Sequence, residues 1–136
     1  MTLVTTSRKP VPELRTFSKD LAFTLEASYK PRGKAGLGVV LEEDTCVLVV
    51  YREAGDIIVD VYASGENVAA LKFPSFEVKR REGPLSRGIQ TGNQTVYNAL
   101  IKYLDVTLTE TGGDVVSFHG PQGRQYVLRN VKCAGA

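Results

Sequence analysis

The sequence contains few of the residues that build catalytic and metal sites. Its 136 residues include two cysteines, one histidine and no tryptophan. Cys46 and Cys133 are too few for a disulfide framework or a four-ligand zinc site, so we expect incidental thiols in a reducing compartment. His119 stands beside a Gly-Pro turn and would have to supply any histidine-based catalysis alone. We therefore expect it to be a surface turn residue.

Long apolar stretches are also absent. No window approaches the roughly 18 consecutive apolar residues of a membrane-spanning helix, and the N-terminus lacks the apolar segment of a signal peptide. We therefore expect no membrane partner and a cytoplasmic protein, or a nucleolar one if the source is eukaryotic. Apolar residues at 43% and charged residues at 24% are ordinary for a soluble globular protein. The length fits one domain, residues 1–136.

Two patterns that could bind a nucleotide or a metal ion are incomplete. Gly33, Gly36 and Gly38 do not form the phosphate-binding pattern G-x-x-x-x-G-K-[ST], and no predicted strand directly precedes them. Residues 42–44 form an acidic run, but adjacent carboxylates more often belong to a solvated loop than to a metal site. We therefore expect no metal ion, no cofactor and no enzymatic activity.

Positive and negative charges alternate along the chain, although the net charge is only +2. Residues 1–35 carry seven Lys/Arg against three Asp/Glu, and residues 36–66 carry one against seven. Residues 67–104 carry six against two, and residues 105–136 carry three of each. This pattern predicts a polarised surface if the fold brings the two basic blocks together.

The basic residues gather at turns marked by proline and glycine. The first cluster lies on a predicted helix and at its two ends, and consists of Arg8, Lys9, Arg15, Lys19, Lys30, Arg32 and Lys34. The second cluster precedes another predicted helix and consists of Lys79, Arg80, Arg81 and Arg87. One such cluster is usually solvated surface. Two clusters at loop–helix junctions favour a polyanion site, for which the candidate stacking groups are Phe23, Tyr29 and Tyr97.

The first third of the chain predicts a strand, a helix and a loop. Residues 3–7 are β-branched and indicate an edge or first strand. Residues 12–28 indicate a helix, because Pro12 suits its first turn and apolar residues follow at spacings of three and four. Phe23 lies off the main apolar face of this helix, so we expect it to face outward or to meet a second layer. Residues 30–38 contain proline and three glycines and indicate a loop.

The middle of the chain predicts a hairpin followed by further strands. Residues 46–51 and 57–62 are apolar and flank a glycine turn. The first of these strands is apolar almost throughout, which predicts a central strand with helices covering both faces. Residues 71–80 also have strand character, and Pro74 within them indicates an edge or a break.

The last third predicts a second helix and a second hairpin. Residues 91–104 indicate a helix that opens with Thr91 and Gln94 in capping-box spacing. Residues 120–123 indicate a turn between two β-like segments. A lead-in, an amphipathic helix and an apolar hairpin therefore occur once in each half. The expected fold is α/β, a mixed sheet with covering helices and two pseudo-repeat halves.

Three stretches of the sequence carry a family signature: Thr5-Thr6-Ser7-Arg8 with Pro10, the segment RTFSKDLA at 15–22, and Arg32-Gly33-Lys34. In these stretches the chain resembles the Brix-domain family of ribosome-biogenesis proteins. The family's L-P-x-G-P-T segment is replaced here by YASGENVAALKF, which keeps only the glycine. The chain most resembles the short archaeal-type members that consist of the domain alone.

The resemblance implies a fold similar to the anticodon-binding domain of class II aminoacyl-tRNA synthetases. It also implies a non-catalytic, RNA-binding assembly factor that acts in pre-ribosomal RNA processing and small-subunit maturation. The implied partners are pre-ribosomal RNA and other ribosome-assembly proteins. We expect the first basic cluster to contact RNA, and we assign the second to the same role on charge alone.

Two other hypotheses stay open. The chain could be a protein-interaction scaffold in a pre-ribosomal particle, with its acidic middle and an exposed apolar stripe docking partner proteins. It could also be an enzyme that acts on RNA through His119 or the carboxylates at 42–44.

Overall fold

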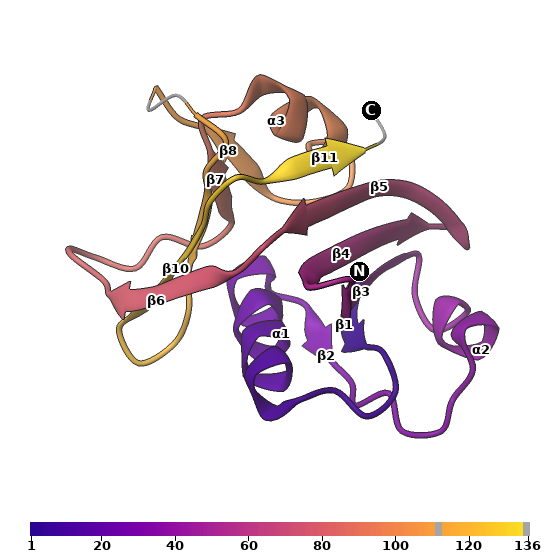
Figure 1. Ribbon diagram of the computed structural model, residues 1–136. Helices are drawn as coiled ribbons and strands as arrows, with labels where there is room; N and C mark the ends of the chain where they lie inside the picture. The colour runs from indigo at the N-terminus through magenta and orange to yellow at the C-terminus, as the bar shows by residue number, and fades with distance from the viewer. Residues whose placement is uncertain (111–112, 135–136) are drawn as a thin grey trace.

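Two mixed β-sheets share one apolar core in the computed structural model, which describes residues 1–110 and 113–134 (Figure 1). Within those residues the larger sheet has the strand order β11-β5-β4-β3-β1-β2 and the smaller has the order β6-β10-β9-β7-β8. The strands are β1 (Thr2–Thr6), β2 (Ser28–Tyr29), β3 (Cys46–Glu53), β4 (Asp56–Ala63), β5 (Glu66–Phe73), β6 (Phe76–Arg80), β7 (Ile89–Thr91), β8 (Val106–Leu108), β9 (Val116–His119), β10 (Arg124–Leu128) and β11 (Lys132–Ala134). The helices are α1 (Pro12–Leu25), α2 (Leu37–Leu41) and α3 (Gln94–Leu100). The predicted α/β class is confirmed.

The same order of elements occurs in both halves of the chain. In each half a strand–helix–strand unit forms a parallel pair, β1 with β2 around α1 and β7 with β8 around α3. A hairpin follows each unit, β3–β4 in the first half and β9–β10 in the second. The halves differ at one pairing, because β3 runs parallel to β1 whereas β9 runs antiparallel to β7. The likeness to anticodon-binding domains stays a prediction.

The two halves exchange edge strands. After β5 the chain passes Pro74 and enters the smaller sheet as β6, which pairs with β10. After β10 it returns to the larger sheet as β11, which pairs with β5. The two crossings are visible at the left and the top of Figure 1. The break predicted at Pro74 is therefore confirmed, and it is the place where the chain changes sheets.

The first helix ends earlier than its apolar pattern predicted. Glu26 adopts a left-handed conformation with φ of 54°, and its backbone N–H donates to carbonyls of the last helical turn. The next residues then pair with β1 as the short strand β2. Consequently β1 is an interior strand with neighbours on both sides, and the alternative of an edge position is wrong.

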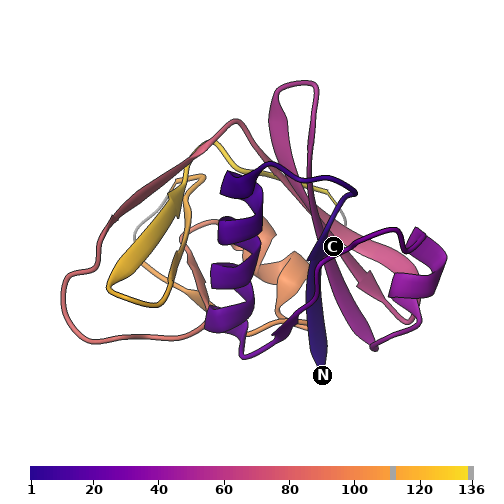
Figure 2. The same ribbon diagram turned by 90° about the horizontal axis from the view of Figure 1, so that it is seen from below.

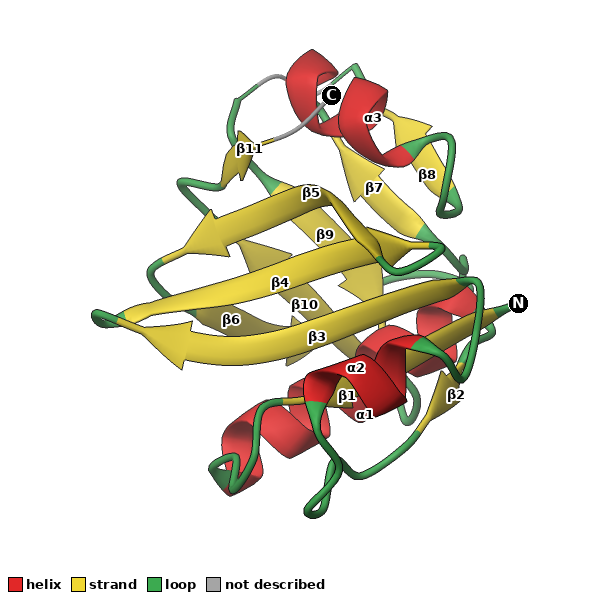
Figure 3. Ribbon diagram, turned by 90° about the vertical axis from the view of Figure 1, so that its right-hand side faces the viewer, coloured by secondary structure: helices red, strands yellow, loops and turns green. Residues whose placement is uncertain are grey.

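Strand β3 is covered on both faces, as its apolar sequence predicted. Leu48 and Val50 belong to the shared core, whereas Val47 and Val49 pack against Val40 of α2 on the outer face. Figure 3 shows α2 lying over the larger sheet near β3 and β1. Helix α2 starts inside the segment that glycine and proline marked as a loop, because five residues are too few for a visible helical period.

Helix α3 starts three residues later than predicted. Asn93 is its N-cap, and the Asn93 Oδ1 atom accepts hydrogen bonds from the backbone N–H groups of Thr95 and Val96. Thr91 is instead the last residue of β7, and its hydroxyl donates to the carbonyl of Val115 at 3.0 Å. The capping box assigned to Thr91 and Gln94 is therefore wrong, because the threonine hydroxyl is used inside the sheet.

Helix α1 lies between the two sheets and fixes them to each other (Figure 2). Phe17 on its inner face packs against four aromatic rings at centroid distances of 4.8–5.9 Å. These rings come from both sheets and are Phe73, Phe76, Phe118 and Tyr126. The helix therefore contributes the centre of the core rather than covering one sheet from outside.

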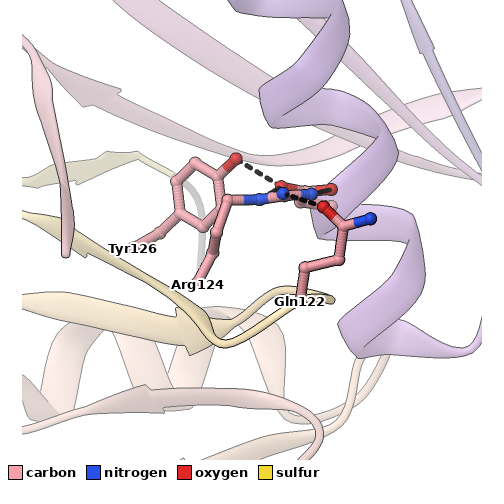
Figure 4. A network of polar contacts seen from close by, with 4 residues as sticks. Gln122, Arg124 and Tyr126 are labelled. Carbon is pink, nitrogen blue, oxygen red and sulfur yellow. Dashed lines mark hydrogen bonds and ion pairs between the residues drawn. The ribbon is translucent and has the colours of Figure 1, made fainter. Parts of the chain in front are cut away.

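One buried carboxylate joins α1 to the smaller sheet. Asp20 is 3% exposed, and its two oxygens accept hydrogen bonds from Nε and Nη2 of Arg124 at 2.8 and 3.1 Å. The hydroxyl of Tyr126 donates to the same carboxylate. Figure 4 shows Arg124 and Tyr126 reaching from β10 toward the helix, with Gln122 holding the guanidinium from the other side. Burial and the nearby Asp20 raise the pKa of Tyr126, so its hydroxyl stays protonated and donates.

Gly120 allows this approach. A Cβ atom at this position would lie 3.2 Å from Oδ2 of Asp20 and 3.2 Å from the ring of Tyr126. A side chain there would push the β9–β10 turn away from α1.

We expect Asp20→Asn to destabilise the fold by about 2–3 kcal/mol. Breaking a buried ion pair by removing one partner costs roughly 3–5 kcal/mol, and Arg124 retains partial access to solvent, which lowers that cost. Urea unfolding measures the difference. Glu13→Gln, an exposed change on the same helix, is the matched control and should cost less than about 0.5 kcal/mol. Equal stability of the two variants would contradict the role assigned to Asp20.

Candidate nucleic-acid interface

The two basic turns of the first cluster meet at one end of α1. Because β1 and β2 are parallel and α1 runs back between them, the segments that follow the two strands lie side by side. Nη2 of Arg8 donates to the carbonyl of Lys34 at 3.2 Å. Nη1 and Nε of Arg32 donate to the carbonyls of Thr6 and Ala35 at 3.1 and 2.7 Å. Hydrogen bonds from these two arginines therefore hold the two turns together.

A hollow of about 390 Å³ opens between these turns. We call it the basic hollow. It is lined by Thr6, Lys9, Pro10, Arg15, Tyr29, Pro31, Arg32, Gly33 and Lys34. Four of these nine residues are cationic and none is acidic, so the hollow presents only positive side-chain charge to a ligand.

Lys30 is the member of the first cluster that turns away from this arrangement. Its ammonium group forms an ion pair with Glu43, in the loop that precedes β3. A lysine engaged with a carboxylate offers less charge to an anion than a free one. Lys30 is therefore the weakest contact candidate of the cluster.

The outer face of α1 continues the basic surface away from the hollow. Arg15 lines the hollow itself, and Nζ of Lys19, one turn further on, lies 5.7 Å from the ring centre of Tyr29. One turn beyond, the guanidinium of Arg87 stacks over Phe23 at 4.2 Å and donates to the Phe23 carbonyl at 2.9 Å. Figure 2 shows α1 along its length, with no other described element in front of the helix. We call Arg15, Lys19, Phe23 and Arg87 the α1 stripe.

Two carboxylates flank the stripe at its ends. Glu13 is exposed in the first turn, and Glu26 lies 3.7 Å from Arg87 at the C-terminal end. The acidic run at 42–44 reaches the basic turns through Glu43, which pairs with Lys30, and it also lies beside the start of β1, where Thr45 donates to the carbonyl of Met1 at 3.3 Å. No acidic residue is among the described residues that line the basic hollow.

The second basic cluster is split between two faces of the smaller sheet. Arg80 pairs directly with Arg124, so both project toward α1, whereas Lys79 pairs with Gln125 and projects to the opposite face. There Lys79 lines a separate polar groove of about 300 Å³ with Ser117 and Gln125. Arg81 follows β6 and its Nε donates to the carbonyl of Gly83 at 3.4 Å. Of this cluster, Arg87 joins the α1 stripe, Arg80 lies on the same side, and Lys79 does not.

The three candidate stacking residues have different surroundings in the structure. Tyr29 and Phe23 lie at the basic surface, beneath Lys19 and Arg87 respectively. Tyr97 packs against the core from α3, and Tyr29 is also partly buried against the core from β2. The Tyr29 hydroxyl is buried and has no hydrogen-bond partner among the described residues, and burial raises its pKa.

His119 is buried, so its interpretation as a surface turn residue is wrong. It is 9% exposed, and its Nδ1 atom accepts a hydrogen bond from the backbone N–H of Ser86 at 3.0 Å. Burial, aided by the positive charge of Arg81, lowers the pKa of His119 below its usual value. The neutral imidazole therefore anchors the loop that carries Arg81 and Arg87.

The basic hollow lies between the two turns that proline and lysine marked in the sequence. Pro10 and Pro31 line it, and each directly follows a lysine of the first cluster. The sequence did not predict the role of Arg124, since nothing in it pairs this residue with a carboxylate 104 residues away.

Neither a metal-binding cluster nor a membrane-spanning helix occurs among the described residues. Across residues 1–110 and 113–134, no cluster of three or more His, Cys, Asp or Glu side chains is arranged to hold a metal ion. In the same ranges, every helix is too short or too polar to cross a membrane.

Comparison with known proteins finds likeness in structure alone. No protein-family model and no curated protein sequence matches the chain. The crystal structure of Mil, an archaeal Imp4-like protein, matches with a TM-score of 0.66 and 20% identity over 98% of this chain and 100% of that one. A probable ribosomal biogenesis protein from Aeropyrum pernix K1 matches with a TM-score of 0.66 and 18% identity over 99% and 96%. The chain therefore has the fold of these two proteins over its whole length.

We expect acid to destabilise the protein through His119. The folded-state pKa lies below the unfolded value of about 6.5, so the unfolded chain binds the proton more readily. This contribution to stability is complete well above pH 6.5 and is lost as the pH falls from there toward the folded-state pKa. His119→Asn keeps an acceptor for Ser86 but does not titrate.

Urea unfolding at several pH values between about 7.5 and 5 tests this expectation. The stability difference between the wild type and His119→Asn should move against the wild type as the pH falls, since all other titrating groups are common to both. A difference that is constant with pH would contradict it.

Proposed function

We propose that the protein is a non-catalytic RNA-binding assembly factor in ribosome biogenesis, acting on pre-ribosomal RNA during small-subunit maturation. The contacts come from the basic hollow and the α1 stripe. The observation that carries the proposal is the continuity of these two surfaces, from Lys34 and Lys9 through Arg15 and Lys19 to Arg87. Two proteins of similar structure, an archaeal Imp4-like protein and a probable ribosomal biogenesis protein, support the same role.

The geometry suits the phosphate backbone of RNA. Helix α1 has 14 residues and is therefore about 21 Å long, enough to lie along several successive phosphates. Contacts made mainly by lysine and arginine to phosphate give strong salt dependence and modest sequence preference. A non-catalytic role agrees with His119, whose Nδ1 is already engaged by the chain itself.

A protein-interaction scaffold is the second candidate. Helix α2 exposes Leu37 and Val39, at 39% and 61%, beside a hollow of about 800 Å³ that contains the carboxylates at 42–44. A basic partner protein with an apolar patch would suit this face. Under this alternative the basic turns contact acidic surfaces of partner proteins, so Arg32→Ala with Lys34→Ala weakens a protein complex and leaves RNA affinity unchanged.

We expect the affinity for single-stranded RNA to fall steeply with salt. Neutralising about five phosphates gives a slope of about −3.5 for log K against log salt concentration. The double change Arg15→Ala and Lys19→Ala should reduce this slope by about 1.4, because each lost phosphate contact on a single strand accounts for about 0.7. Fluorescence anisotropy at 50–300 mM salt, on the order of the physiological range, measures both slopes.

The matched control is Lys102→Ala with Lys132→Ala. Both lysines are exposed and lie on other elements, so this variant makes the same change in net charge away from the α1 stripe. Its slope should equal that of the wild type. Equal slopes for all three proteins, or a flat salt response of the wild type, would refute RNA binding by this surface.

A further inference from the structure

The basic hollow differs from the α1 stripe because it has depth and apolar walls. Its walls include the ring of Tyr29 and the rings of Pro10 and Pro31, one from each turn. Proline fixes its own backbone angle, so walls built from two prolines are stiff. The hollow's volume of about 390 Å³ lies within the roughly 300–1,000 Å³ of ligand pockets. A phosphate group alone needs neither this depth nor these walls.

Cations surround the apolar walls on several sides. Lys9 and Lys34 are exposed, and each belongs to a different turn. Arg15 enters from α1, and Arg32 is held by the carbonyls of Thr6 and Ala35. A guanidinium has five N–H donors, so Arg32 retains three for a ligand. The hollow thus combines a fixed arginine and apolar walls with two exposed ammonium groups.

We propose that the basic hollow binds one unpaired nucleotide of RNA. Its base contacts Tyr29, Pro10 and Pro31, and its phosphates lie on Lys9, Lys34 and Arg15. This inference rests on the proposed function, because it names the class of RNA feature that the same surface selects. Bases inside a duplex are stacked and paired, so only an unpaired nucleotide can place its base in the hollow.

One residue of the basic hollow has an unusual backbone conformation. Lys9 adopts a left-handed conformation with φ of 52°, which a residue with a side chain seldom adopts. Glycine adopts this conformation without strain. Lys9→Gly should therefore preserve stability while it weakens RNA binding, which separates a contact role from a structural one.

Three RNAs test the proposal directly with the unaltered protein. The first is a duplex with one bulged nucleotide, the second has an abasic residue at the bulge, and the third is fully paired. The first two carry the same phosphates and differ only in the base. We expect the abasic RNA to bind about tenfold more weakly, in the range measured for loss of one base–aromatic contact. The salt slopes of the two should be equal.

Variants of the protein test whether the ring of Tyr29 causes the preference for the intact bulge. Tyr29→Leu should remove the preference for the intact bulge, whereas Tyr29→Phe, which keeps the ring and removes a hydroxyl without a described partner, should retain it. Phe23→Leu is the matched control, because it removes the other aromatic ring of the basic surface and leaves the hollow intact. Thermal unfolding of each variant verifies that it is folded.

The outcomes distinguish this inference from the proposed function. Equal affinity for the intact and abasic bulges, with a steep salt slope, overturns the inference and leaves RNA binding in place. Failure to bind any of the three RNAs overturns both. Binding of a free nucleoside monophosphate as tightly as the bulged RNA assigns the hollow to a small ligand and overturns the inference for RNA.

Discussion

The bidentate contact between Asp20 and Arg124 determines how α1 sits between the two sheets. A carboxylate that is only 3% exposed needs hydrogen-bond donors for its oxygens, and here Arg124 and Tyr126 supply them. Both partners stand on β10, so the rotation of the helix about its own axis is fixed relative to the smaller sheet. Apolar packing around Phe17 is less directional and would tolerate a small rotation.

The candidate interface follows from that rotation. Successive residues of an α-helix are about 100° apart, so a helix with Asp20 against β10 places Lys19 about 100° and Arg15 about 140° away from that contact. Lys19 and Arg15 are both exposed, on a side of the helix turned away from β10. Parallel pairing of β1 and β2 brings the flanking turns to the same end. The buried ion pair and the strand–helix–strand unit together generate the hollow and the stripe.

Local patterns in the sequence predicted much of this fold. The hairpin of β3 and β4, the break at Pro74 and the cover on both faces of β3 follow from short-range chemistry and were confirmed. Two of the wrong predictions have a different cause, because each depends on a distant partner. Thr91 bonds to Val115 instead of capping a helix. His119 is buried because the loop containing Ser86 folds over it.

The positions of the two basic clusters in the structure show why a run of basic residues in the sequence only partly predicts a basic surface. On α1, Arg15, Lys19 and Phe23 are spaced by four, so helical geometry keeps them on one face wherever the helix packs. On β6, the adjacent Lys79 and Arg80 must point to opposite faces, because side chains alternate along a strand. A ligand on one face of the sheet can therefore contact only about half of the basic residues in such a run. The basic residues on the helix can nearly all face the same ligand. Most of the candidate interface therefore lies in the N-terminal half of the chain.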